Sequence, residues 1–314
     1  MAHSRALVAG LGVVVLWASA FPAVRVAVPE FGAAALSLAR LLVATVALLA
    51  MAPLFKVKLP RWRDVPLILG CGLFGMAAYQ VLLNWGEVSV PAGTASMIIA
   101  AAPLVSVGVA AVVFREKLTM VKVVGSAVAV AGVAVVASAR SELSLSSAVW
   151  ILIGATIVQG VYHPMIRPLL HRYSGVEVAT YAMVAGTLML LPLLPGSWGH
   201  LTSASVGAWW SVVYLGVFPS AVGFVLWGYA VGRLPMITST SLLYLVPAFA
   251  VLIAYVWLGE VPVIGELVGG VIVLIGVVTV GLGGPISRRL RGHHQKRERT
   301  AAPIGVVEST TTSA

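Results

Sequence analysis

The sequence predicts an all-α polytopic membrane protein whose ten transmembrane helices form two inverted five-helix repeats. Three observations support this fold class. Hydrophobic residues make up 60% of the 314-residue chain and charged residues only 10%, whereas soluble domains contain about 25% charged residues. The apolar residues form long runs, each close to the roughly 20 residues that a membrane-spanning helix needs. The second half of the chain also repeats the pattern of the first half.

The ten predicted spans follow one another with short loops between them. They lie at residues 6–28, 31–54, 65–86, 91–113, 119–138, 147–168, 176–195, 207–231, 235–257 and 262–284. In the first span, Ala18-Ser19-Ala20 imitates the cleavage site of a signal peptide. We expect the span to be retained, because its apolar run continues to Val28 and because it matches the sixth span.

The repeat is clearest between Pro91–Glu116 and Pro235–Glu260, which lie 144 positions apart. Each stretch has a proline at its start, a second proline in its middle (Pro103 or Pro247) and a glutamate at its end. A central proline argues against a helix in water, but in a membrane neighbouring helices can satisfy the carbonyl group that it frees. Both stretches are therefore predicted to be kinked spanning helices. The predicted divisions are a first repeat at 1–139, a second repeat at 140–286 and a disordered tail, basic and then rich in Ser and Thr, at 287–314.

The positions of Lys and Arg predict the orientation, because these residues concentrate in cytoplasmic loops. With both termini in the cytoplasm, 17 of the 20 Lys and Arg residues fall inside, Arg25 and Arg140 fall outside, and Arg40 lies within a helix. Glu116 then lies inside and Glu260 outside, so the two repeats run in opposite directions. This distribution explains the net charge of +10 without nucleic-acid binding. It predicts a multi-pass protein of the cytoplasmic (inner) cell membrane.

Several stretches resemble a known family. Trp17-Ala-Ser-Ala-Phe-Pro22 resembles the first-helix signature of EamA-type transporters of the drug/metabolite transporter superfamily, and Arg40 resembles that family's second-helix arginine. The similarity is greatest over Gly216–Glu260 and extends to about residue 284. It implies two inverted five-helix bundles that carry small metabolites through a central cavity. Inverted repeats favour alternating access, since related halves can exchange conformations of similar energy.

The acidic residues argue against an enzyme and against a carboxylate at the bilayer centre. Asp64 is the only aspartate, and the glutamates within the predicted fold lie at helix ends, in loops or, for Glu266, one turn into the last span. No paired carboxylates, Ser/His/Asp arrangement or metal-ligand cluster is apparent, so no cofactor or metal is predicted. Glu116 and Glu260 are expected to bond backbone N–H groups that start the next helix. Transport is predicted to be facilitative or proton-coupled through a side chain other than a carboxylate.

Arg40 lies about nine residues into the second span, roughly 13 Å from its external end. An arginine at that depth is costly without partners. Two interpretations stay open: Arg40 binds carbonyl groups of kinked helices near Pro22 or Pro103, or it anchors a substrate carboxylate.

His163 and Tyr162 directly precede Pro164 in the sixth span. Pro164 leaves the carbonyl group of Gly160 without its helical donor. His163 is a candidate proton acceptor in a cavity, since the unperturbed pKa of histidine is about 6.5. Alternatively, it bonds a helix carbonyl group.

Aromatic side chains inside the spans predict a cavity for an organic solute with few polar contacts, although each of them also suits helix packing. The predicted cavity residues are Trp17, Ser19, Phe21, Arg40, Tyr79, Ser96, Gln159, Tyr162, His163, Phe224, Trp227, Ser241 and Tyr244. The predicted kinks are at Pro22, Pro103, Pro164 and Pro247.

Together these features predict a secondary active or facilitative transporter of small organic metabolites, either amino acids or drug-like solutes. The family resemblance favours export. One alternative is a carrier of phosphorylated or nucleotide-linked sugars, which would need several cations in the cavity where only Arg40 qualifies. Another is a membrane scaffold or receptor that transports nothing. The expected partners are a small-molecule substrate and the lipid bilayer, and the sequence predicts no particular oligomeric state.

Overall fold

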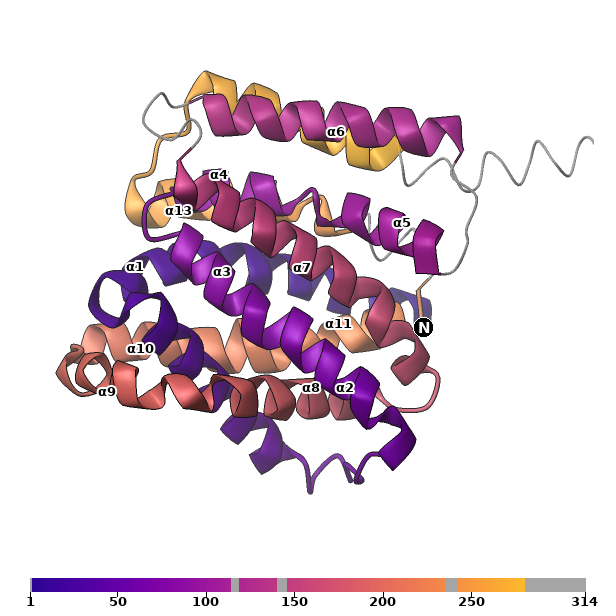
Figure 1. The fold of residues 1–314 in the computed structure, drawn as a ribbon, viewed down its shortest axis with the longest axis vertical. Helices are drawn as coiled ribbons and strands as arrows, with labels where there is room; N and C mark the ends of the chain where they lie inside the picture. Colours follow the sequence, from indigo (N-terminus) through magenta and orange to yellow (C-terminus); the bar gives the residue numbers. More distant parts are fainter. Residues whose placement is uncertain (1, 114–118, 140–145, 235–241, 280–314) are drawn as a thin grey trace, which may run out of the picture.

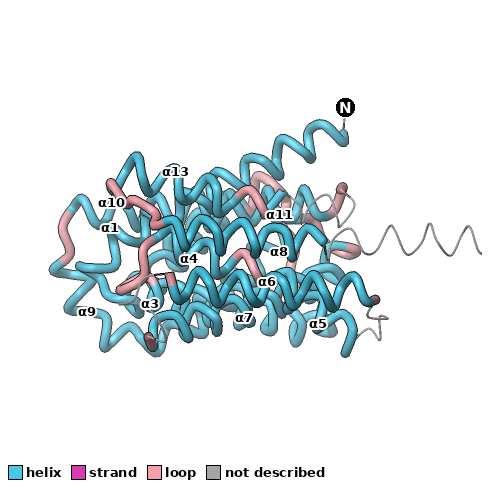
Figure 2. Tube along the Cα trace, turned by 90° about the horizontal axis from the view of Figure 1, so that it is seen from above, coloured by secondary structure: helices cyan, strands magenta, loops and turns pink. Residues whose placement is uncertain are grey.

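The computed structural model describes residues 2–113, 119–139, 146–234 and 242–279, and these residues are almost entirely helical (Figures 1 and 2). Seven helices in this part of the chain are long and apolar enough to cross a membrane. The first of them, Ser4–Met51, contains two predicted spans, and the shorter apolar helices Val246–Leu258 and Ile264–Thr279 complete the set of ten. The predicted fold class is therefore confirmed.

The first repeat begins with one long helical segment that Gly32 interrupts. Its elements are α1 (Ala2–Met51), η1 (Trp62–Asp64), α2 (Val65–Cys71), η2 (Gly72–Ala78), α3 (Tyr79–Gly86), α4 (Ala92–Ile99), α5 (Ala102–Val113) and α6 (Met120–Ser138). Gly32 has φ 68° and ψ 169°, a conformation that glycine adopts without steric cost. This residue separates the first span from the second, and it lies just inside the predicted second span, which begins at residue 31.

The second repeat follows the same order. Its elements are α7 (Ser147–Leu170), α8 (Gly175–Leu190), η3 (Leu191–Leu193), α9 (Leu194–Ser203), α10 (Val206–Leu215), η4 (Gly216–Val222), α11 (Gly223–Val231), α13 (Val246–Leu258) and the last helix, Ile264–Thr279. The predicted tail at 287–314 lies outside the described residues.

The two repeats depart from α-helical geometry at corresponding positions. The π-helices η2 and η4 start at Gly72 and Gly216, 144 positions apart. The turn at Ala100–Ala101 between α4 and α5 corresponds to the turn at Tyr244–Leu245 before α13, again 144 positions apart. The inverted repeat therefore extends to the local backbone, and π-helical segments are frequent at functional sites.

The helix α6 and the last helix lie side by side at one edge of the bundle (Figure 1). Glycines let their backbones approach closely, as is common between membrane helices. A Cβ atom added at Gly132 would lie 2.5 Å from the backbone nitrogen of Val273, and one at Gly276 would lie 2.6 Å from the carbonyl oxygen of Gly125. This pair of helices stands apart from the cavity described below.

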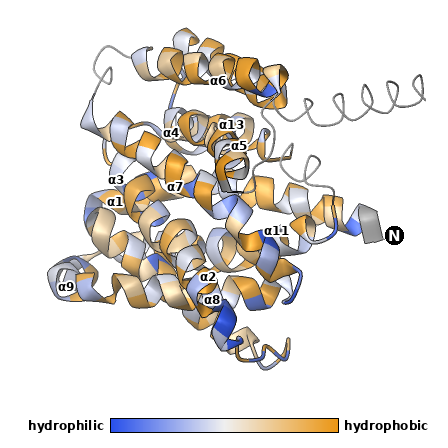
Figure 3. Cartoon of the chain, turned by 45° about the vertical axis from the view of Figure 1, so that its right-hand side comes forward, coloured by the Kyte–Doolittle hydropathy of each residue, from blue (hydrophilic) through white to orange (hydrophobic). Residues whose placement is uncertain are grey.

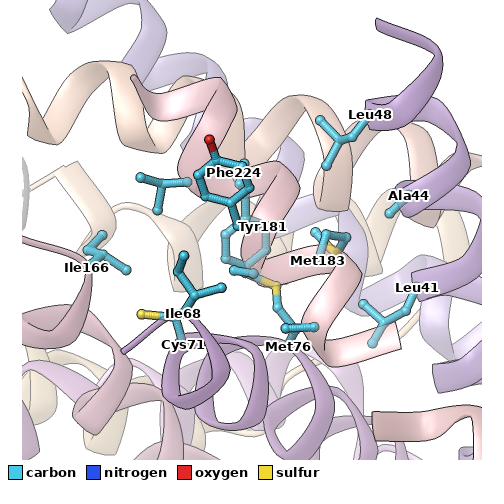
Figure 4. Close-up of a cluster of buried hydrophobic side chains, with 14 of the residues drawn as sticks. Leu41, Ala44, Leu48, Ile68, Cys71, Met76, Ile166, Tyr181, Met183 and Phe224 are labelled. Atoms are coloured by element: carbon cyan, nitrogen blue, oxygen red, sulfur yellow. The ribbon is translucent and has the colours of Figure 1, made fainter. Parts of the chain in front are cut away.

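The largest apolar cluster packs α1 against α2, η2, α7, α8, η4 and α11. Figure 4 shows Leu41, Cys71, Met76, Met183 and Phe224 among its members, all of them buried. Apolar residues also cover most of the length of the helices (Figure 3), as expected for a protein whose solvent is lipid.

Candidate functional site

A cavity of about 70 Å³ lies between the two repeats. This is room for several water molecules. Residues from α1, α3, α4, α5, α7, α11 and α13 line it, as do residues next to the turn before α13. The predicted cavity residues that line it are Trp17, Phe21, Arg40, Tyr79, Ser96, Gln159, His163, Phe224 and Tyr244. The predicted kinks Pro103 and Pro247 line it as well. The matched turns meet here, since Ala100 and Tyr244 both lie on the wall.

Arg40 is held on the cavity wall by the second repeat. It is buried, with 3% exposure, and its Nε atom donates a hydrogen bond of 2.8 Å to Oγ of Ser220 in η4. Its Nη1 atom has no hydrogen-bond partner among the described residues. One side of the guanidinium group is therefore fixed, while the other keeps a donor for a further acceptor. A buried donor without a partner costs about 1–3 kcal/mol, so a ligand that supplies an acceptor would recover that free energy.

Other polar atoms near the cavity are likewise buried without a hydrogen-bond partner. The side chain of Gln80, Oε1 of Gln159 and Nε2 of His163 are buried and have no partner within the described part of the chain. Gln159 and His163 lie one helical turn apart on α7, so both face the same side. The wall thus offers amide oxygens, an imidazole nitrogen and a guanidinium N–H, but lacks a carboxylate among its described lining residues. Such a set suits a small zwitterion or a polar organic solute.

The carbonyl group that Pro164 frees has a partner from another helix. Oγ of Ser106 in α5 donates a hydrogen bond of 2.8 Å to the carbonyl oxygen of Gly160. A Cβ atom at Gly160 would lie 2.6 Å from the carbonyl oxygen of Ala102, so α5 and α7 approach closely at this point. Because Ser106 bonds the carbonyl oxygen of Gly160, His163 is not needed as a donor to it.

Trp17 joins the first span to η4. Its Nε1 atom donates a hydrogen bond of 3.1 Å to the carbonyl oxygen of Pro219. Its ring centroid lies 5.2 Å from that of Phe224 and 5.5 Å from that of Trp227. The aromatic part of the wall is thus a packed group with a fixed shape.

Several predicted cavity residues lie elsewhere. Ser19 exchanges a hydrogen bond of 2.6 Å with the hydroxyl group of Tyr214. Tyr162 is buried in the large apolar cluster against Gly75, and Trp227 packs in the same cluster behind Trp17. Ser241 lies outside the described residues. Pro22 and Pro164 lie within α1 and α7, away from the cavity lining.

The structure brings two residues to this site that are not among the predicted cavity residues. Gln80 lines the cavity, and its polarity within an apolar span is a detectable signal. Ser220 holds Arg40, but nothing in the sequence links two residues that lie 180 positions apart.

On one side of the cavity, α4 and α13 are joined by a glutamate. Oε2 of Glu260 accepts a hydrogen bond of 2.9 Å from the backbone nitrogen of Ala92, and Oε1 lies 3.5 Å from Nε of Arg25. Glu260 therefore bonds the start of α4 in the other repeat, contrary to the expectation that it bonds the next helix. Glu266 bonds the backbone nitrogen of Val263 at 2.9 Å instead. Glu116 lies outside the described residues.

These features define a class of protein: a ten-helix membrane transporter with a central cavity between inverted repeats. The model of the EamA-like transporter family matches residues 4–138 and 146–282. The chain belongs to the EamA-like transporter family, and it is a transporter rather than an enzyme.

Relatives in other organisms agree with this assignment. A probable terminal-alkyne amino-acid exporter of Streptantibioticus cattleyicolor is 54% identical over 280 residues, which cover 89% of this chain and 94% of the relative. The uncharacterized transporter YdfC of Bacillus subtilis is 33% identical over 83% of this chain and 86% of its own. A probable amino-acid metabolite efflux pump of Salmonella typhimurium is 26% identical over 89% of this chain and 95% of its own.

A solved crystal structure supports the fold. It covers 91% of this chain and 99% of its own with a TM-score of 0.62, at 18% sequence identity.

Proposed function

We propose that the protein exports a small amino acid with an apolar side chain, a terminal-alkyne amino acid among them, by alternating access across the cytoplasmic membrane. Both termini lie in the cytoplasm, as the distribution of Lys and Arg indicates. The observation that carries the proposal is the Nη1 donor of the buried Arg40, which has no partner among the described residues and lies on the wall of an aromatic cavity. The exporter from Streptantibioticus cattleyicolor, at 54% identity, supports the choice of substrate class.

Each part of such an amino acid has a complementary group in the cavity. Arg40 binds the carboxylate through Nη1, because charge-assisted N–H···O bonds are the strong ones. The amide oxygens of Gln80 and Gln159 accept hydrogen bonds from the ammonium group. Trp17 and Phe224 contact the apolar side chain, and the polarised C–H group of a terminal alkyne suits the negative face of an aromatic ring.

The matched irregularities of the two repeats support alternating access. The turns at Ala100–Ala101 and Tyr244–Leu245 give α4–α5 and α13 corresponding points of bending. Pro103 and Pro247 lie next to these turns and line the cavity. If each half bends at its own turn, the cavity opens to one side of the membrane at a time.

Flux of L-propargylglycine, a simple terminal-alkyne amino acid, tests the proposal. Purified protein is reconstituted in liposomes, and the accumulated alkyne is measured by coupling to a fluorescent azide. We expect flux well above that of protein-free liposomes, competition by small apolar amino acids and no competition by sugar phosphates. If the folded protein moves neither propargylglycine nor any competitor amino acid, the proposed function is wrong.

A further inference from the structure

One face of α3 carries a buried polar row that the family assignment does not explain. Gln80, Asn84 and Glu87 lie four and then three residues apart, so they share a helix face. All three are 0% exposed. Both amide atoms of Gln80, Oδ1 of Asn84 and both carboxylate oxygens of Glu87 have no hydrogen-bond partner among the described residues. Buried polar groups are normally paired, so three neighbouring exceptions require an explanation.

The row is present in one repeat only. At the positions 144 residues later, α11 carries Phe224, Gly228 and Val231. The fold itself therefore does not need polar side chains on this face, because the inverted copy of the same helix is apolar. Burying polar groups without partners costs free energy. Since only one repeat carries this costly row, we expect the row to have a role that only one half performs.

The row connects the cavity to the contacts between the repeats. Gln80 lines the cavity, and Asn84 donates a hydrogen bond of 2.9 Å to Oγ of Ser37. Glu87 follows the membrane span Trp62–Gly86 directly. The carbonyl oxygen of Glu87 accepts a hydrogen bond of 2.7 Å from Nη1 of Arg25.

The charged and titratable neighbours of Glu87 come from three parts of the chain. Arg25 and Arg40 belong to α1, Glu260 follows α13, and the phenol of Tyr79 lies on α3 itself. Burial raises the pKa of Glu87 well above its usual range, while Arg25 and Arg40 lower it and Glu260 raises it. An isolated buried carboxylate is costly when ionised, and such groups take up a proton instead.

We propose that Glu87 is the proton-binding residue of this transporter, and that its proton exchanges for the amino acid. The proposal rests on the proposed function. A proton from the external side binds the Glu87 carboxylate when α4 and α13 separate. When the amino acid enters from the cytoplasm, its ammonium group lies at Gln80, at the cavity end of the polar row, and repels the bound proton. The proton then leaves to the cytoplasm, so one proton moves in for each zwitterion that moves out.

A gradient experiment in proteoliposomes tests this exchange. Liposomes with an acidic interior and the membrane potential clamped are given external L-propargylglycine. Wild-type protein is expected to accumulate it by up to about tenfold per pH unit, as one-to-one exchange requires. Glu87→Gln should lose this accumulation but keep exchange of propargylglycine at equal pH. Glu87→Asp should restore part of the accumulation, which separates loss of the proton site from misfolding.

One variant is the matched control. Glu30→Gln removes an exposed carboxylate that bonds Ser205, and it should accumulate the alkyne as wild-type does. Accumulation by folded Glu87→Gln, or accumulation driven by a Na⁺ gradient instead of a pH gradient, would each overturn the proposal.

Infrared spectroscopy gives a readout that does not depend on the solute. At neutral pH the wild-type protein should show the carbonyl stretch of a protonated carboxylic acid, and Glu87→Gln should lack it. If the wild-type protein moves no propargylglycine, the proposed function fails and this band alone decides the proton site. An unchanged spectrum in Glu87→Gln would overturn the assignment of Glu87.

Discussion

The carboxylate of Glu260 accepts a hydrogen bond from the backbone nitrogen of Ala92 at 2.9 Å, which ties the end of α13 to the start of α4. The same carboxylate pairs with Arg25 at 3.5 Å. Close packing supports the contact, since a Cβ atom at Gly93 would lie 3.1 Å from a side-chain methyl group of Val251. The two repeats are thus joined on one side of the cavity, the side that we assign to the exterior.

Loss of this carboxylate should open the cavity to the exterior. Cys71 is the only cysteine and is buried, so Cys71→Ala with Ser96→Cys provides a single reporter on the cavity wall. Adding Glu260→Ala should increase external labelling by a membrane-impermeant maleimide several-fold, because a hydrogen bond to a charged group contributes about 1.5–3 kcal/mol. Adding Glu30→Ala instead is the control, since Glu30 bonds Ser205 away from this contact. Equal labelling with and without Glu260 would mean that this contact does not close the cavity.

Pro103 and Pro247 are predicted to be needed for bending. Replacing either with Ala restores a backbone donor next to the turn and favours a continuous helix. We expect each single substitution to reduce propargylglycine flux several-fold while the folded yield stays normal. Pro168→Ala, in α7 and away from the cavity lining, should leave the flux unchanged. Normal flux in both folded variants would show that the prolines only shape a static cavity.

The close packing of η2 on α7 gives a stability prediction. A Cβ atom at Gly75 would lie 2.3 Å from the Tyr162 ring, whereas one at Gly108 meets nothing within 4 Å. Gly75→Ala should therefore destabilise the protein by about 1–3 kcal/mol, as overpacking does. Gly108→Ala should cost nothing, since alanine favours a helix. Thermal unfolding in detergent measures both, and similar melting temperatures for the two variants would contradict the packing described here.

The buried carboxylate of Glu87 should make the folded protein less stable as the pH rises. Burial holds the pKa of Glu87 well above its usual range, so between the unfolded and folded pKa values the folded state binds more protons. Stability should then fall as the pH rises above the ordinary pKa of a glutamate, about 4.3. Glu87→Gln removes this contribution, and its melting temperature should fall less steeply between pH 5 and pH 8. Parallel curves for the two proteins would indicate that Glu87 ionises freely in the folded state.

The ten spans and the inverted repeat could be predicted from the sequence, because hydropathy and the spacing of Pro91–Glu116 and Pro235–Glu260 are properties of the chain alone. The rotation of each helix about its own axis, which decides the side chains that face the cavity, could not be predicted. Tyr162 and His163 are neighbours in sequence, yet one packs against Gly75 and the other lines the cavity. One step along a helix turns a side chain by about 100°, and hydropathy is too uniform here to choose the face.

Glu87 illustrates a second limit. The sequence places it at a helix end, where a carboxylate is ordinarily solvated. The structure buries it, because α1 and the chain after α13 cover the end of α3. Burial of this kind depends on contacts between segments far apart in sequence. The hydrogen bond between Arg40 and Ser220 also joins segments far apart in sequence, so the sequence does not predict it.

The role of Arg40 is the central claim, and the most direct test compares two solutes that differ only in the carboxylate. Flux of L-propargylglycine is measured beside flux of propargylglycinamide, with Ser220→Ala as the variant that loses the Arg40 partner but keeps the arginine. Wild-type protein should transport L-propargylglycine about tenfold or more faster than propargylglycinamide, since a charge-assisted hydrogen bond contributes about 1.5–3 kcal/mol. Ser220→Ala protein should also prefer the amino acid over the amide. Folded Arg40→Met should lose this preference. Equal flux of the two solutes through the wild-type protein, or an unchanged preference in Arg40→Met, would contradict the account.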